Sequence, residues 1–201
     1  MTFAQLRSDR GQTLPIYIWL TGILLFAALA FFVFAQAASA RNGAQSAADA
    51  AALAAARDSR DELMTGLAGA VGTDDHWLDW LKGNLFNGTG AAAAAGRLAA
   101  ENDSTVRGFT QTAVNGFPGY RVDIETRYTV GDSIIPGTEG RQAKAHAVAV
   151  IEPRCTFAAD ADPTKPVRLD CDGQTVNIDP EDFHSDELPD ASMLFSVHLA
   201  E

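Results

Sequence analysis

Two cysteines, Cys155 and Cys171, are the residues of this chain most able to form a covalent bond with each other. In an oxidising compartment outside the cytoplasm they can pair as a disulfide. Such a bridge would restrain the loop between them by roughly 3 kcal/mol on the chain-entropy account. Two free buried thiols are the alternative. Zinc is not expected, because two cysteines without nearby paired histidines fall short of four ligands.

No other set of residues forms a recognisable catalytic motif. The sequence lacks a GxSxG element, a phosphate-binding loop, an HExxH pair and a nucleotide-binding glycine pattern. Residues 170–182 hold some carboxylates of a calcium loop, but lack the third carboxylate before the glycine and the final glutamate. The histidines are scattered, at His76, His146, His184 and His198. We therefore expect no enzymatic activity, no cofactor and no metal.

The N-terminal part of the chain holds a long apolar run. Residues 11–40 carry no formal charge. As a helix they would reach about 45 Å, which exceeds the ~30 Å hydrocarbon core of a bilayer, so the helix should tilt or continue out of the membrane. Arg7 and Arg10 precede the run, and cytoplasmic flanks are rich in such residues. This predicts a cytoplasmic tail (1–10), a single transmembrane helix (11–40) and an extracytoplasmic C-terminal domain in the cell membrane.

A cleaved secretory signal is the rival interpretation of the same run. Ala38-Ser39-Ala40 has the small-x-small form that precedes such a cut. The apolar stretch from Leu14 to Phe34 is longer than the 7–15 residues usual in a signal peptide, which favours a retained anchor. Both interpretations export the same C-terminal domain.

The charge balance limits the partners of the exported part. The chain has a net charge of −11, and residues 1–40 contribute +1, so the remainder carries −12. Binding to nucleic acid requires clustered Lys and Arg, and is therefore not expected. The same balance argues against adhesion to an anionic membrane surface. Its simplest consequence is solubility.

Residues 41–70 form an alanine-rich continuation of the span. Alanine is the best helix former, so helix is expected without a break from about Pro15 to about Leu67. Small side chains allow a second helix to approach closely. Packing of the helix on the chain's own domain is the alternative, and the sequence leaves both open. The candidate helix-packing residues are Ala44, Ala47, Ala48, Ala51, Ala52 and Ala55.

The remainder, residues 71–201, is expected to be one exported α+β domain with short helices and an antiparallel sheet. Helical spacing predicts a helix over Asp74–Asn87 with Asp74 as its N-cap, and Ala91–Asn102 predicts another. Trp77 and Trp80 fit either an aromatic core or a contact with a membrane surface or partner.

The second half of this domain shows the alternation of strands. Apolar and polar residues alternate over 122–130 and again over 143–150, and the two runs can pair as an antiparallel hairpin across the loop 131–140. Val167–Asp170 and Thr175–Ile178 are shorter candidates. The apolar residues at 194–199 suggest a final strand or tail that docks on the domain.

A charged N-terminus with RGQ, an apolar span and the stretch RNGAQSAADAAALAAA together resemble the TadE/TadG-like proteins of tight-adherence, Flp-type pilus assembly. The match is densest over residues 10–57, and the chain looks most like the actinobacterial TadG-related branch. The alanine-alternating strand 143–149 is similar to the usual C-terminal strand of the family. The resemblance implies a non-catalytic, membrane-anchored, minor-pilin-like or assembly protein. Its expected partners are membrane lipid and other pilin-like proteins, met through the N-terminal helix.

The resemblance also implies a candidate processing site. Pilin-like members are cut after a glycine, here Gly11, which would make Gln12 the first residue. They carry glutamate at the fifth position beyond the cut, where this chain has Ile16. Ile16 cannot form the ion pair that such a glutamate makes in lipid, so an accessory component is favoured over a major filament subunit. A ligand-binding or sensory outer domain, suggested by Trp77 and Trp80, is the alternative function.

Overall fold

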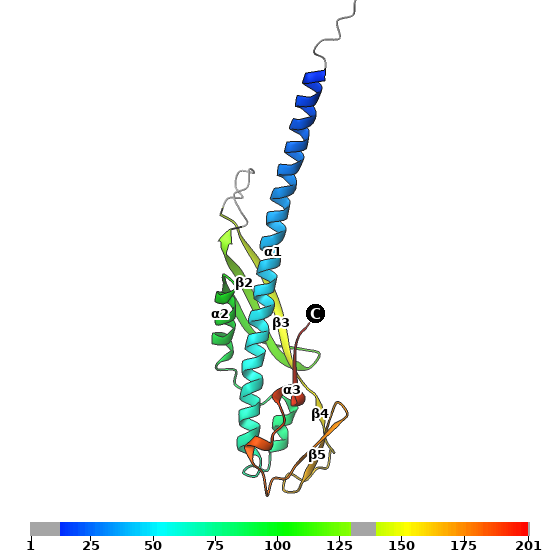
Figure 1. Cartoon of the computed structure of the whole chain (residues 1–201). Coiled ribbons are helices and arrows are strands. Elements are labelled where there is room, and N and C mark those ends of the chain that lie inside the picture. Colours follow the sequence, from blue (N-terminus) through cyan, green and yellow to red (C-terminus); the bar gives the residue numbers. More distant parts are fainter. Residues whose placement is uncertain (1–12, 130–139, 201) are drawn as a thin grey trace, which may run out of the picture.

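A computed structural model describes residues 13–129 and 140–200 of the chain. One long helix runs the length of the molecule, and all other elements gather around its C-terminal half (Figure 1). In chain order the elements are α1 (Thr13–Ala70), η1 (Trp77–Lys82), α2 (Ala91–Glu101), β1 (Ser104–Val114), β2 (Phe117–Thr129), β3 (Gln142–Pro153), β4 (Cys155–Thr156), β5 (Val167–Cys171), β6 (Gln174–Ile178), η2 (Ser185–Glu187), α3 (Ala191–Leu194) and β7 (Phe195–Leu199).

The helix α1 is continuous, as its composition predicts. Beyond Pro15, which lies in its first turn, it contains no proline. It ends where Gly72 adopts a φ of +73°, a left-handed conformation that glycine accepts without strain. The expected helix from about Pro15 to about Leu67 is therefore confirmed and extends to Ala70.

The main sheet has four antiparallel strands in the order β1-β2-β3-β7. The expected hairpin of two alternating runs is confirmed as β2 and β3, with Val122 opposite Ala147 and Ile124 opposite Ala145. The expected docking of the C-terminal segment is confirmed as β7, which places Val197 opposite Ile151. Most of the loop predicted over 131–140 lies outside the described residues.

The strand β1 has no counterpart among the expectations from sequence. It joins β2 through a two-residue turn, Asn115-Gly116, in which both residues have positive φ, 53° and 86°. Asn-Gly between two strands is the usual residue pair of such a hairpin. The register shifts between Val106 and Gly108, which breaks the alternation of β1.

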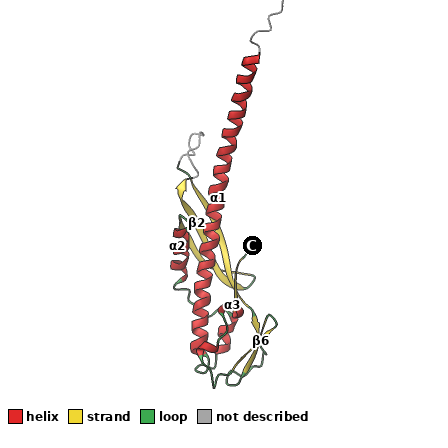
Figure 2. Cartoon of the chain, in the orientation of Figure 1, coloured by secondary structure: helices red, strands yellow, loops and turns green. Residues whose placement is uncertain are grey.

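The core lies between the sheet and two helices. α1 and α2 cover the same face of the sheet (Figure 2), and the alanines of both helices are buried there together with Val122 and Ile124 of β2. Trp77 is fully buried, and its indole N–H donates to the carbonyl of Pro163 at 2.8 Å. Of the two interpretations of the aromatic segment, an aromatic core holds for Trp77.

The helix expected over Asp74–Asn87 is wrong in type and extent. Only Trp77–Lys82 is helical, and it is the 3-10 helix η1. The Asp74 side chain accepts a hydrogen bond from the amide of His76 at 2.8 Å, and this forms a turn that precedes the helix rather than an α-helical cap. Gly83, with a φ of +74°, ends the helix after six residues.

The second sheet, β4-β5-β6, stands at the end of the domain farthest from the N-terminus of α1 (Figure 1). Its strands β5 and β6 confirm the short strands expected around Cys171-Asp172-Gly173. Asp172 has a φ of +51° and Gly173 a φ of +83°, the pair of positive values that a tight hairpin turn requires.

Replacement of Gly66 by alanine tests the packing of η1 on α1. A methyl group on Gly66 would overlap the indole ring of Trp80. We expect Gly66→Ala to lower the free energy of unfolding by about 1–3 kcal/mol, because overpacking outweighs the gain in helix propensity. Denaturant unfolding of the purified chain measures the change. Gly96→Ala in α2 is the matched control: nothing lies within 4 Å of its added methyl group, so it should stabilise by up to ~1 kcal/mol. Equal effects of the two substitutions would contradict this packing.

Removal of the bond between Ser59 of α1 and Tyr120 of β2 tests the contact of helix and sheet. Their hydroxyl oxygens lie 2.7 Å apart, and both side chains are buried. Tyr120→Phe leaves Ser59 without this partner, so we expect a loss of about 1–3 kcal/mol. The double variant with Ser59→Ala should lose less than the sum of the two single variants, as measured in a double-mutant cycle.

Alkaline pH gives a second readout of the same contact. Burial raises the pKa of Tyr120 above its ordinary value of 10.0. As pH rises past that value, the unfolded chain therefore loses the phenolic proton before the folded chain does. The stability that depends on the neutral phenol is complete below this pH and declines above it. In Tyr120→Phe this alkaline decline should be smaller, and an unchanged decline would count against the burial of the phenol.

Candidate membrane anchor and packing surface

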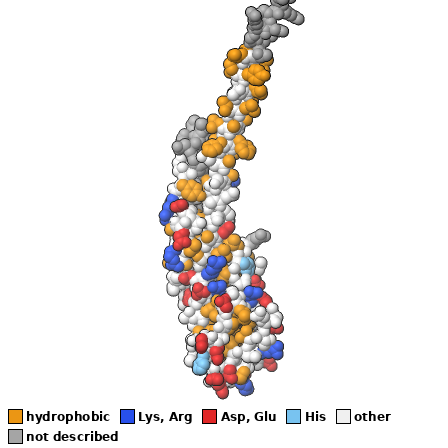
Figure 3. Space-filling view, viewed as in Figure 1, with side chains coloured by type: hydrophobic (Ala, Val, Ile, Leu, Met, Phe, Trp, Pro, Cys, Tyr) orange, Lys and Arg blue, Asp and Glu red, His pale blue; other side chains and the backbone are white. Residues whose placement is uncertain are grey.

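The N-terminal part of α1 projects from the domain without protein around it. We call residues Leu14–Ser39 the stalk. Among the described residues, large apolar side chains with more than a third of their surface exposed are concentrated on it, and Phe31 is 78% exposed. Figure 3 shows hydrophobic side chains along the whole described length of the projecting helix. Such a surface is stable in lipid or against other apolar helices, but not in water.

The stalk has the dimensions of a membrane span. At ~1.5 Å per residue it rises about 39 Å, which crosses a ~30 Å hydrocarbon core with some tilt. Of the described helices, α1 alone is long and apolar enough to cross a membrane. Its backbone amides and carbonyls bond within the helix, so no partner is needed for them in lipid.

The stalk ends where the domain begins. Ala40 is the first buried residue of α1, and it forms a small apolar cluster with Ala44 and with Ala143 of β3. Arg41, the first charged residue after the apolar run, lies at this same point. The end of the uncharged segment and the start of tertiary packing therefore coincide.

The six candidate helix-packing alanines all lie in the half of α1 that is covered by the domain. Each is fully buried in the single chain: Ala44, Ala47, Ala48, Ala51, Ala52 and Ala55. Five of them share the main core with α2 and with Val122, Ala147 and Ala149 of the sheet. Of the two alternatives left open by the sequence, packing on the chain's own domain is the one observed, and these side chains present no free surface to a second helix.

Hydrogen bonds connect the C-terminal part of α1 to the rest of the domain. Besides the Ser59–Tyr120 bond, the carboxylate of Glu62 accepts hydrogen bonds from the amides of Asn87 and Gly88, at 2.8 and 2.9 Å. Glu62 thus holds the loop before α2 against α1. Sequence analysis missed both contacts, because their partners are 25 to 61 residues apart and no local pattern marks them.

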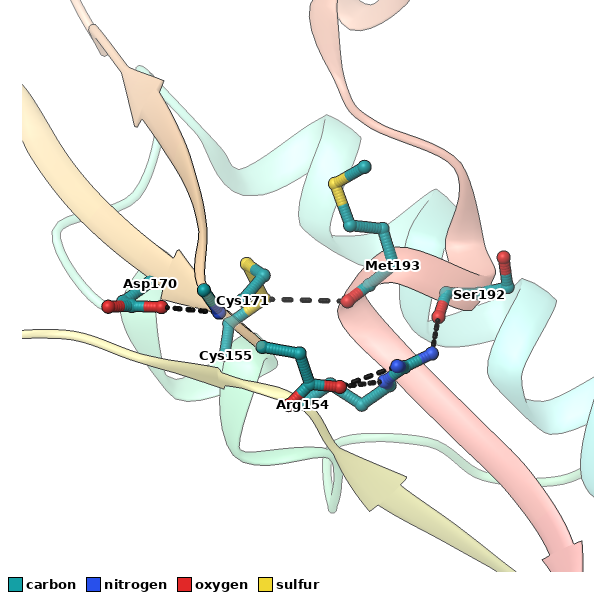
Figure 4. The surroundings of a disulfide bond; sticks show 8 residues. Arg154, Cys155, Asp170, Cys171, Ser192 and Met193 are labelled. Carbon is teal, nitrogen blue, oxygen red and sulfur yellow. Dashed lines mark hydrogen bonds and ion pairs between the residues drawn. A yellow bond between two sulfur atoms is a disulfide. The ribbon is translucent and has the colours of Figure 1, made fainter.

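Cys155 and Cys171 form the expected disulfide, which joins β4 to β5. Figure 4 shows Arg154 beside it: its guanidinium pairs with the carboxylate of Asp172, 2.7 Å from Nε to Oδ2, and donates to the carbonyl of Ser192 at 2.9 Å. The bridge joins two strands within the small sheet, and the arginine connects that sheet to α3. Cys155 and Cys171 therefore serve in structure, and the alternative of two free thiols is wrong.

Two carboxylates at the turn of the segment 170–182, those of Asp170 and Asp172, have partners within the protein. The Asp170 side chain accepts from the amide of Gly173 at 3.0 Å, and Asp172 pairs with Arg154. Within residues 13–129 and 140–200, no group of three or more His, Cys, Asp or Glu side chains is arranged to hold a metal ion. The geometry gives these acidic residues a role in the turn.

The candidate processing residues Gly11 and Gln12, and the tail 1–10, lie outside the described residues. The structure describes α1 from Thr13 onward. Cleavage and topology therefore stay predictions from the sequence.

Comparison with known protein families returns one match. The model described as "Putative Flp pilus-assembly TadE/G-like" matches residues 11–58, which span the stalk and the first part of the buried half of α1. No curated protein and no solved structure matches the chain. The resemblance seen in the sequence is confirmed over this segment, and residues 11–58 are similar to the TadE/G-like Flp pilus-assembly family.

Proposed function

We propose that this chain is a single-pass envelope protein that acts without catalysis in pilus assembly, as a minor-pilin-like or accessory component. The observation that carries the proposal is the coincidence at Ala40 and Arg41. An uncharged, largely exposed stalk of membrane-spanning length passes at that point into a folded domain. The TadE/G-like match covers this same junction.

In this proposal the stalk, and not the alanine-rich half, meets other pilus proteins. The alanines are already covered by α2 and the sheet, whereas aromatic and aliphatic side chains project from the stalk around its circumference. Within a membrane, helices associate through van der Waals packing of such surfaces. Gly22 has no side chain and open space around it, so a neighbouring helix could approach closely there.

An accessory role fits the residues at the start of the chain better than a filament role does. Ile16 takes the position at which glutamate could pair with the free N-terminus of a neighbour in lipid. The ligand-binding alternative loses its main support, because Trp77 is part of the core and Trp80 packs over Gly66.

The proposed topology places residues 1–10 in the cytoplasm and the domain outside. Single cysteines at Ala4 and at Gln111, an exposed residue of β1, report the two sides. Cys155 and Cys171 are joined to each other and do not react. In right-side-out membrane vesicles an impermeant maleimide should label Gln111→Cys at once and Ala4→Cys only after permeabilisation. The reverse order would overturn the proposed orientation, and recovery of the chain in the soluble fraction would overturn the anchor.

The role of the stalk in assembly is separable from its role as an anchor. We expect a variant with residues 17–34 replaced by leucine to remain in the membrane, since length and apolar character are preserved. It should lose cross-linking to co-expressed pilin-like proteins and lose pilus assembly. Gly11, Gln12 and Ile16 are unchanged in this variant, so processing is unaffected. If the leucine variant assembled pili as well as the wild type, the stalk would act only as a membrane anchor. That result would contradict its role in packing against other pilus proteins.

A further inference from the structure

Three basic side chains meet at the base of the stalk. Arg41 of α1, Arg141 just before β3 and Lys144 of β3 line one open hollow of about 900 Å³. Arg41 lies about a hundred residues from Arg141 and Lys144 in the sequence, and the packing of Ala40 and Ala44 on Ala143 brings them together. The hollow therefore has a cationic wall built from two separate elements.

The other wall of the hollow is apolar and belongs to α1. It consists of Phe34, Ala37 and Ala38, in the last two turns of the stalk. Phe34 is 76% exposed, so its ring is available to a second apolar group. A cationic wall that faces an apolar wall, at the end of a membrane-length helix, has the polarity of the lipid–water interface.

One carboxylate, Glu125, lines the hollow among the described residues, and its charge is already compensated. Its Oε2 lies 2.6 Å from Nε of Arg107, and its Oε1 lies 3.4 Å from Nζ of Lys144. The hydrogen bond from Arg107 lowers the pKa of Glu125, which keeps this carboxylate ionised. Because Arg107 neutralises Glu125 from outside the hollow, the described residues that line the hollow have a net positive charge.

The location of this positive charge is unusual for so acidic a chain. The net charge is −11, and Figure 3 shows carboxylates gathered at the end of the domain farthest from the stalk. The base of the stalk can therefore contact an anionic membrane surface, although the net charge of the whole chain is negative. An anion there meets local cations, while the acidic end lies away from the membrane.

We propose that this hollow binds the headgroup of an anionic phospholipid in the leaflet from which the stalk emerges. The phosphate would lie among Arg41, Arg141 and Lys144, and the acyl chain along Phe34 and Ala37. Guanidinium groups match phosphate geometry with paired donors, and a basic residue near an anionic surface attracts it within a Debye length. The proposal rests on the membrane insertion proposed above, and it would fix the depth and tilt of the stalk.

Lipid retention by the full chain tests the proposal. The chain is reconstituted into nanodiscs of phosphatidylcholine and phosphatidylglycerol in equal amounts, and native mass spectrometry counts the lipids that it retains. Wild type should retain phosphatidylglycerol preferentially. The triple variant Arg41→Gln, Arg141→Gln, Lys144→Gln should lower this preference on the order of fivefold or more at low salt. A triple variant with the same preference as wild type would overturn the proposal.

Matched controls separate the hollow from general charge and from folding. Lys82→Gln, Lys165→Gln and Arg168→Gln remove the same charge from exposed positions outside the hollow and should leave the preference intact. The double variant Arg41→Lys, Arg141→Lys keeps the charge and should retain most of the preference for phosphatidylglycerol. A loss in the first control would assign the preference to net charge and overturn the proposal. Failure of wild type to insert would instead reject the anchor, a different result.

Free inorganic phosphate is the other ligand that three cations in this hollow could bind. Sodium phosphate and sodium chloride at equal ionic strength should weaken the lipid preference alike, through screening. Specific displacement of phosphatidylglycerol by inorganic phosphate would show a site for free phosphate and contradict the lipid assignment.

Discussion

One unbroken helix must satisfy two environments, and the rest of the structure depends on this constraint. α1 keeps its backbone hydrogen bonds internal throughout, so the same element can cross lipid and support a folded domain. Its side chains change after Phe34, from mostly bulky apolar residues to mostly alanine, and their burial begins at Ala40. Because the helix does not bend into separate pieces, the position of the domain relative to the stalk is fixed by the packing of the alanine-rich half.

That packing is built from small residues and completed by a few large ones. Alanine buries little area, so its contribution comes from close approach of α2 and the sheet rather than from the size of any one side chain. Large buried side chains fill the core near the C-terminal end of α1. They are Leu63 and Leu67 of α1, Trp77 of η1 and Phe195 of β7. Ser59 and Glu62 add directional bonds that a uniformly smooth alanine surface lacks. In the proposed function, the stalk makes the contacts with other pilus proteins.

Charge is also distributed unevenly along the length of α1 and its domain. Cations at the base of the stalk lie where lipid headgroups would be, and carboxylates concentrate toward the distal end. Such an arrangement orients a domain against an anionic surface, although its total charge is repelled by that surface. The disulfide joins β4 to β5 within the distal sheet, and Arg154 connects that sheet to α3 through the carboxylate of Asp172 and the carbonyl of Ser192.

The sequence by itself determined the features that repeat locally. The uncharged run, the alanine-rich helix, the alternation of β2 and β3 and the TadE/TadG-like stretch are each contained in one continuous segment. β1 escaped prediction because its register shift at Gly108 interrupts the alternation. The 3-10 helix η1 replaced the expected α-helix because Asp74 and Gly83 limit it at both ends. Only the tertiary structure decided that the alanines face their own domain and that Arg41 meets Arg141 and Lys144. Periodicity specifies that a face is small or apolar, whereas its partner depends on strand order and contacts between distant segments.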